Sequence, residues 1–340
     1  MELKFEAIAE DLPGTKWQGH FRSAWPDYQR WFLQEGEHAR PYYLSSVRAL
    51  RDHMPELMPT YERLAELAGG GDLEARFLSL YCPPPYLTGC SQAVWSGPPP
   101  LLVRNYDYSP RLCEATIMKT AWNGRGVIAM SDCIWGVLDG VNADGLAVSL
   151  SFGGLKVVGE GFGVPIVLRY VLEFCTTLNE AVKVLERVPC HMAYNVTLLD
   201  RGGAYATVYV APDRPAQVLD QPYCTNHQDR TDWEPYVRAS GSVEREQFIA
   251  ARLRDGAGDA ESFVGEFLRP PLYSTAYARG FGTLYTAVYE PGAGANYLWP
   301  HFSWRQSFAS FTEGVHRVRP QPGNELPVDP TSPSTDQEAS

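Results

Sequence analysis

The chain has 340 residues, of which 44% are hydrophobic and 12% aromatic, and its formal net charge is −11. This apolar content excludes a wholly disordered protein, and the length suits two domains or one large layered domain. The acidic balance, without any cluster of Lys and Arg, argues against nucleic acid or an anionic membrane as a partner. No apolar run approaches the roughly 18–20 residues that a membrane-spanning helix needs.

The N-terminal residues lack the basic and apolar regions of a signal peptide, so we expect a cytoplasmic protein. The seven cysteines include no Cys-x-x-Cys pair, which disfavours a disulfide framework and a zinc cluster. We therefore expect reduced cysteines, no metal and no cofactor. One of the cysteines remains a candidate nucleophile.

The predicted elements change character near residue 80. Apolar residues at helical spacing predict helices between residues 26 and 80, interrupted by glycines at 69–71. Three prolines at 83–85 exclude a helix interior or a central strand. Strands are predicted after this break over 87–95, 101–106, 115–121, 126–130 and 146–152.

Helices and strands then alternate in groups. A helix is predicted over 163–175, and Thr177 and Glu180 form a capping box for the next one. Two strand groups separated by helices favour an α+β fold with two stacked sheets over a parallel βαβ alternation. The remaining predicted elements are strands at 194–199, 204–210 and 217–219, helices at 243–253 and 260–268, and a hairpin of 283–289 with 297–299.

The segment Gly89-Cys90 opens the first strand after the proline break. A glycine before the cysteine lets other groups approach the peptide bond between them closely. By itself, Cys90 is more simply a structural cysteine. The next strand, however, contains Arg104 and Asp107 where a core strand would be apolar; the plainer interpretation is an edge strand with a surface ion pair.

Five segments follow one another along the chain. They are Gly89-Cys90-Ser91, Arg104-Asn105-Tyr106-Asp107, Gly140-Val141-Asn142-Ala143-Asp144-Gly145-Leu146, Thr225-Asn226-His227, and Thr283-Leu284-Tyr285-Thr286 with Trp299-Pro300. In this order they resemble the acyl-coenzyme A:6-aminopenicillanic acid acyltransferase family of cysteine N-terminal nucleophile hydrolases. The choloylglycine hydrolases are its more distant relatives. The resemblance covers about residues 87–304 and implies a four-layer αββα sandwich.

The resemblance also implies a precursor that cuts itself between Gly89 and Cys90. Residues 1–89 would be a helical prosegment that stays as a partner of the mature protein, 90–320 the hydrolase domain, and 321–340 a disordered tail. The thiol of Cys90 would be the nucleophile and its new α-amine the general base. An α-amine suits this role because its pKa, about 7.7–8.0, lies near the working pH.

Four further residues receive roles from the resemblance. Arg104 would lower the pKa of the thiol, and Asp107 would orient the new ammonium. Asn226 would donate to the oxyanion, a contribution of about 3–4 kcal/mol, and Arg245 would pair with acidic groups or substrate. One difficulty is that Arg104 and Asp107 should point to opposite faces of a regular strand, so a bulge or strand end is needed to bring both to one site.

The substrate is expected to be a small molecule with a linear amide bond. We place Trp95, Tyr106, Phe152 and His227 near the pocket, and the aromatic residues suggest an apolar or aromatic acyl group. Bile salt hydrolases carry an asparagine where residues 150–153 here read Leu-Ser-Phe-Gly, which argues against bile salts.

Three alternatives remain open. The acyl group could pass to an amine instead of water, although we prefer hydrolysis because a transferase needs an additional acceptor site. An ordinary thiol amidase would use His227 as the base and stay uncut. A non-catalytic binding protein of the same fold would never process itself. The sequence leaves the oligomeric state undecided.

Overall fold

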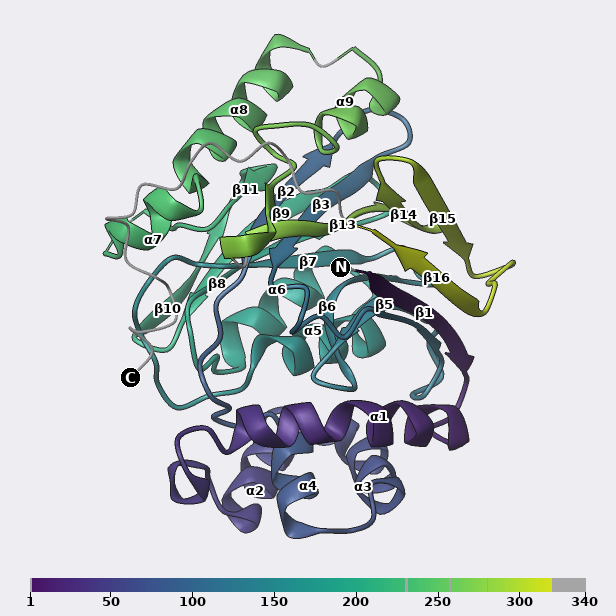
Figure 1. The fold of residues 1–340 in the computed structure, drawn as a ribbon, viewed down its shortest axis with the longest axis vertical. Coiled ribbons are helices and arrows are strands. Elements are labelled where there is room, and N and C mark those ends of the chain that lie inside the picture. Colours follow the sequence, from purple (N-terminus) through teal and green to yellow (C-terminus); the bar gives the residue numbers. More distant parts are fainter. Residues whose placement is uncertain (1, 230–231, 257, 280, 320–340) are drawn as a thin grey trace.

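A computed structural model describes residues 2–229, 232–256, 258–279 and 281–319; the tail predicted at 321–340 lies outside this range. Two β-sheets are stacked on each other, and a group of helices lies at one end of them (Figure 1). No helix in the described part of the chain is long and apolar enough to cross a membrane. All seven cysteines are unpaired.

The N-terminal segment begins with a strand that was not predicted from the sequence. In β1 (Leu3–Glu10), Leu3, Phe5 and Ala7 are buried, and this alternation is the signal of a strand. Helix α1 begins well before the predicted start because Trp17 is also buried. The helices that follow are α1 (Thr15–Phe32), α2 (Tyr43–His53), α3 (Met58–Leu67) and α4 (Asp72–Leu78), with short 3-10 turns at Glu37–Ala39 and Pro55–Leu57.

The larger sheet has the strand order β10-β9-β8-β7-β6-β5-β4-β1-β16. Strand β1 runs parallel to β4 on one side and antiparallel to β16 on the other. The expected description of residues 1–89 as helical is therefore incomplete, because their first strand is part of a sheet. The other strands are β4 (Thr116–Thr120), β5 (Val127–Asp132), β6 (Gly136–Asn142), β7 (Ala147–Phe152), β8 (Tyr194–Leu199), β9 (Tyr205–Ala211), β10 (Arg214–Leu219) and β16 (Gly314–Val318).

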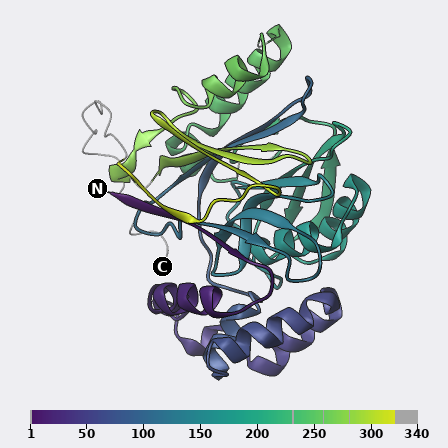
Figure 2. The ribbon, with the colours of Figure 1, turned by 90° about the vertical axis from the view of Figure 1, so that its right-hand side faces the viewer.

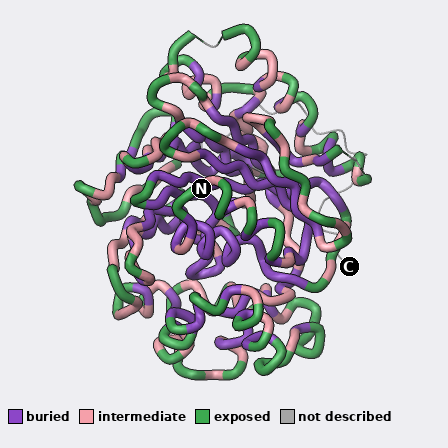
Figure 3. Tube along the Cα trace, turned by 180° about the vertical axis from the view of Figure 1, so that it is seen from behind, coloured by how far each residue is buried: buried purple, intermediate pink, exposed green. Residues whose placement is uncertain are grey.

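The smaller sheet has the order β11-β2-β3-β13-β14-β15, with β12 paired to β13. Its central strands β2 and β3 are buried along almost their whole length, as Figure 3 shows for both sheets. The strands are β2 (Gly89–Trp95), β3 (Leu101–Tyr108), β11 (Tyr223–Cys224), β12 (Thr275–Ala276), β13 (Phe281–Glu290), β14 (Gly294–Trp299) and β15 (Phe302–Ser307).

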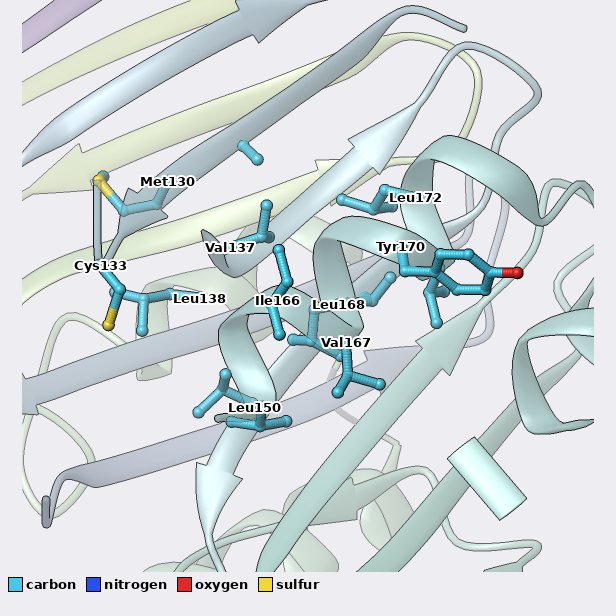
Figure 4. Close-up of a cluster of buried hydrophobic side chains, with 14 of the residues drawn as sticks. Met130, Cys133, Val137, Leu138, Leu150, Ile166, Val167, Leu168, Tyr170 and Leu172 are labelled. Atoms are coloured by element: carbon cyan, nitrogen blue, oxygen red, sulfur yellow. The ribbon is translucent and has the colours of Figure 1, made fainter. Parts of the chain in front are cut away.

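Helices cover the outer face of each sheet, which confirms the predicted αββα sandwich (Figure 2). Helix α5 (Val164–Phe174) packs on the larger sheet, with Ile166 beside Val137 of β6 (Figure 4). The predicted capping box of Thr177 and Glu180 opens α6 (Leu178–Arg187). Over the smaller sheet lie α7 (Glu234–Ala239), α8 (Ser242–Asp255) and α9 (Ala260–Glu266).

Candidate active site

Cys90 is the second residue of β2, and its position fixes which groups surround it. In the ladder with β3, Cys90 lies opposite Tyr106 and Gly89 lies opposite Asp107. Because the register is regular here, Tyr106 and Arg104 share the face of the Cys90 side chain, while Asp107 lies on the other face. No bulge of β3 against β2 brings Arg104 and Asp107 to one side.

Arg104 lies beside the sulfur atom of Cys90, as predicted. Its Nη2 atom is 3.2 Å from the Sγ atom, and its Nη1 atom forms a buried ion pair with Asp139 of β6. Tyr285 donates a hydrogen bond to the Asp139 carboxylate at 2.6 Å. Burial raises the pKa of the Cys90 thiol, and the nearby Arg104 charge opposes this without cancelling it. Burial and the Arg104 guanidinium thus act on the pKa of this thiol in opposite directions.

Asn226 and Arg245 hold the backbone of Cys90. The Cys90 amide donates a hydrogen bond to Asn226 Oδ1 at 2.8 Å, and Arg245 Nη2 donates to the same oxygen at 2.7 Å. Arg245 Nη1 donates to the Cys90 carbonyl oxygen and, at 2.7 Å, to the Ser91 hydroxyl. In the uncut chain, Arg245 thus binds uncharged groups around the nucleophile.

Asp107 is buried next to this backbone. It accepts a hydrogen bond from the Thr283 hydroxyl at 2.6 Å. Burial raises the pKa of its carboxyl group, and the charges of Arg245 and Arg104 oppose the rise. Its negative charge raises the pKa of the Cys90 thiol, and it does so from the face of the sheet opposite to Arg104.

A second group of residues fixes Asn226. The Asn226 amide N–H donates to the Ser242 hydroxyl at 2.7 Å, and His227 Nδ1 lies 2.8 Å from the same hydroxyl. His227 Nε2 pairs with Glu246. These contacts place His227 behind Asn226 rather than at the sulfur atom.

Two donors converge on the carbonyl oxygen of Thr88, directly before the Gly89-Cys90 pair. Asn226 Nδ2 donates to it at 3.1 Å, and the Tyr236 hydroxyl of α7 donates at 2.5 Å. Asn226 Nδ2 also donates to the Phe152 carbonyl oxygen at 3.2 Å. The side-chain amide expected to bind an oxyanion is thus engaged by backbone carbonyls in the uncut chain.

A cavity of about 560 Å³ lies between α1 and the ends of β3 and β5. Of the four residues predicted near the substrate, Tyr106 lines it. Phe152 instead packs against Tyr236, and Trp95 packs against Phe263 of α9 at the far end of β2. Further residues that line the cavity include Tyr28, Trp31, Tyr86, Tyr108, Glu114 and Asp132.

Three neighbours of the site were not predicted from the sequence: Asp139, Ser242 and Tyr236. Asp139 had a signal, because it is a lone carboxylate inside the apolar strand β6. Ser242 and Tyr236 had none, since they reach the site only through the packing of α7 and α8.

Two facing sheets between helical layers form the predicted fold, that of the N-terminal nucleophile hydrolases, and Cys90 lies at the start of an inner strand. The chain belongs to the acyl-coenzyme A:6-aminopenicillanic acid acyl-transferase family, whose model matches residues 95–299. The matched range begins just after Cys90 and includes Arg104, Asp107, Asn226 and Arg245. This confirms the predicted family and the predicted kind of enzyme, an amide hydrolase or acyltransferase.

Solved structures to which the chain is similar include penicillin V acylase from Agrobacterium tumefaciens, which is 16% identical with a TM-score of 0.44; the match covers 67% of this chain and 90% of that one. A conjugated bile acid hydrolase from Clostridium perfringens is 13% identical with a TM-score of 0.47, covering 71% and 99%. The N-acylethanolamine-hydrolyzing acid amidase ortholog of Caenorhabditis elegans is 18% identical with a TM-score of 0.44, covering 68% and 100%. No curated protein sequence matches the chain.

Proposed function

We propose that the chain is a self-processing cysteine amidohydrolase that cleaves linear amides of small N-acylated molecules. The observation that carries this proposal is the arrangement around Cys90. Its sulfur lies 3.2 Å from Arg104 Nη2, and its backbone amide lies 2.8 Å from Asn226 Oδ1. The first contact favours a thiolate, and the second holds the peptide bond that self-cleavage would break.

Self-cleavage begins when the Cys90 thiol attacks the carbonyl carbon of Gly89. The new C–S bond replaces the C–N bond, and the thiol proton passes to the nitrogen, which becomes the α-amine of Cys90. Water then hydrolyses the thioester, leaving a carboxylate on Gly89 and restoring the thiol. Asp107, the ladder partner of Gly89, lies where its charge can hold the new ammonium.

The same chemistry then acts on a substrate amide. The α-amine accepts the thiol proton, the sulfur attacks the substrate carbonyl, and the amine product leaves with that proton. Water, deprotonated by the α-amine, releases the acid and the thiol. Once Thr88 has been displaced by the cut, the side-chain N–H of Asn226 that it engaged is available to the oxyanion.

Intact mass of the purified protein tests self-cleavage. We expect two fragments, 1–89 and 90–340, and a single uncut chain for Cys90→Ala. Cys190→Ala is the matched control, because this cysteine is also buried but lies outside the named strands, in an isolated bridge with Phe162. Slow cutting by Cys90→Ser would add support. An uncut wild-type chain whose activity survives Cys90→Ala would overturn the proposal, and an uncut inert chain would favour a binding protein.

Acyl transfer is the second candidate, and the name of the family favours it. It shares the acyl-enzyme with hydrolysis and differs in the molecule that attacks it. Adding a panel of primary amines to the assay separates the two, since a transferase forms new amides and a hydrolase forms the free acid.

A further inference from the structure

The peptide bond before Cys90 is the first amide that the site would cleave. The groups that bind the preceding segment therefore indicate what the site recognises in an acyl group. In this segment the scissile carbonyl belongs to Gly89, and the next carbonyl towards the N-terminus belongs to Thr88. The Thr88 oxygen is the one on which Asn226 Nδ2 and the Tyr236 hydroxyl converge, at 3.1 and 2.5 Å. It is buried together with both donors.

From this contact we propose that Tyr236 is a substrate-binding residue and that the enzyme prefers acyl groups with a second carbonyl oxygen. If the scissile carbonyl carbon is atom 1 of the acyl chain, the second carbonyl oxygen is bonded to atom 4. An N-acylglycyl amide has this arrangement. The inference rests on the proposed function and adds the class of acyl group.

The surroundings of Tyr236 hold its hydroxyl in place. Its ring packs edge-on against Phe152 at 5.1 Å and stacks on Trp233 at 5.3 Å. Phe152 is in turn tied to Asn226 through its carbonyl oxygen. Burial keeps the pKa of Tyr236 well above its usual range, so the phenol stays protonated and acts as a donor. The Tyr236 hydroxyl is therefore a fixed donor before any substrate arrives, while the Asn226 side-chain N–H serves the oxyanion.

The path of the same segment also provides room beyond this second carbonyl. Going back from Thr88, the chain reaches Tyr86, whose side chain lines the 560 Å³ cavity next to Tyr106. An acyl group that follows this path would place its distal part in the cavity. Trp31, Tyr28 and Tyr108 line it together with acidic side chains such as Glu114 and Asp132, so a bulky end with both apolar and polar parts would fit.

A set of three fluorogenic aminocoumarin amides tests the inference on the mature enzyme. The N-acetylglycyl amide carries both the second carbonyl and the N–H of a peptide, the 4-oxopentanoyl amide keeps only the carbonyl, and the pentanoyl amide has neither. We expect kcat/KM to be higher for the two carbonyl-bearing amides. In Tyr236→Phe, their advantage over the pentanoyl amide should fall about threefold to tenfold, the worth of one neutral hydrogen bond.

Tyr205→Phe, a tyrosine on β9 outside the site, is the matched control and should leave this ratio unchanged. Mass spectrometry first establishes that each variant is cut, and titration of the thiol counts the active sites. If Tyr236→Phe stays uncut, the inference is tested by the wild-type ratio of kcat/KM between the carbonyl-bearing amides and the pentanoyl amide alone. A mature wild-type enzyme without a preference for the carbonyl-bearing amides, or a Tyr236→Phe variant with an unchanged ratio, would overturn the inference. An uncut, inert wild-type chain would instead contradict the proposed function.

Discussion

Arg104 and Asp107, three residues apart on β3, act on Cys90 from opposite faces of the smaller sheet. Arg104 contacts the sulfur from the face between the sheets, whereas Asp107 lies opposite Gly89 on the face towards α8. The difficulty that a strand cannot point both side chains the same way thus disappears. Cys90 meets Arg104 through its side chain, and its backbone N–H donates to Asn226.

We expect Arg104→Met to destabilise the protein by about 3–5 kcal/mol, because it leaves the buried Asp139 carboxylate without its cation. The double variant Arg104→Met, Asp139→Asn removes both charges and should regain most of this loss. Urea denaturation measures both values.

The double variant also tests the effect of Arg104 on the thiol. Without the guanidinium, the pKa of the Cys90 thiol should rise further, so alkylation of the mature enzyme by iodoacetamide should shift to higher pH. An unchanged pH dependence of alkylation would show that Arg104 has no influence on the sulfur.

Replacing Asp107 by Asn should change the pH profile of hydrolysis. A neighbouring carboxylate stabilises an ammonium ion, so losing it lowers the pKa of the α-amine by about one unit or more. The acid limb of the kcat/KM profile should move to lower pH, while kcat falls because the amine is less well oriented. Asp144→Asn, a surface carboxylate paired with Arg125, is the control. An acid limb that stays in place would exclude this role.

His227 should be dispensable for self-cleavage. Its ring pairs with Ser242 and Glu246 behind Asn226, so His227→Ala should still yield the two fragments. Ser242→Ala should slow cutting more, because it deprives the buried Asn226 amide of its acceptor, a cost of about 1–3 kcal/mol. The thiol amidase alternative expects the reverse: an uncut wild-type chain that is active and an inactive His227→Ala.

Stability should fall as pH rises through the titration of Asp132. Burial and the charge of Glu114 raise its pKa from 3.8 to about 7. Between about pH 4 and pH 7 the folded chain therefore holds a proton that the unfolded chain has released. The free energy of unfolding falls with rising pH across this interval and levels off above it. Asp132→Asn should match the wild type near pH 4 and exceed it at pH 8 by about 4 kcal/mol, because the pKa of Asp132 rises from 3.8 to about 7 on folding. Urea denaturation midpoints of the wild type and of Asp132→Asn at pH 4 and pH 8 measure this difference. The same difference in stability at both pH values would contradict the prediction.

Many of the elements and the proximity of Arg104 to Cys90 could be predicted because local signals carry them, whereas β1, β6, β15 and β16 were not predicted. Gly89-Cys90, the polar stretch of β3 and the capping box at Thr177 stand out from their neighbours in sequence. The cavity could not be predicted in this way. Its walls come from α1, β3 and β5, and only their packing places Trp31 near Tyr106.

Strand pairing between segments far apart in the sequence could not be predicted either. The alternation of β1 is as regular as that of β7, yet its pairing partners β4 and β16 lie more than a hundred and about three hundred residues away. Nothing near Leu3 in sequence indicates such partners. For the same reason, the contact of Tyr236 with Thr88 depends on how α7 folds back over β2.

The placement of β1 also determines what a cut before Cys90 would leave behind. Because β1 is hydrogen-bonded to β4 on one side and to β16 on the other, the two fragments would share a sheet and remain together as one particle. A gene that encodes residues 90–340 alone would lack this strand and leave the facing edges of β4 and β16 bare. Exposed edges of this kind pair with those of other molecules, so such a product should aggregate unless residues 1–89 are supplied in the same cell.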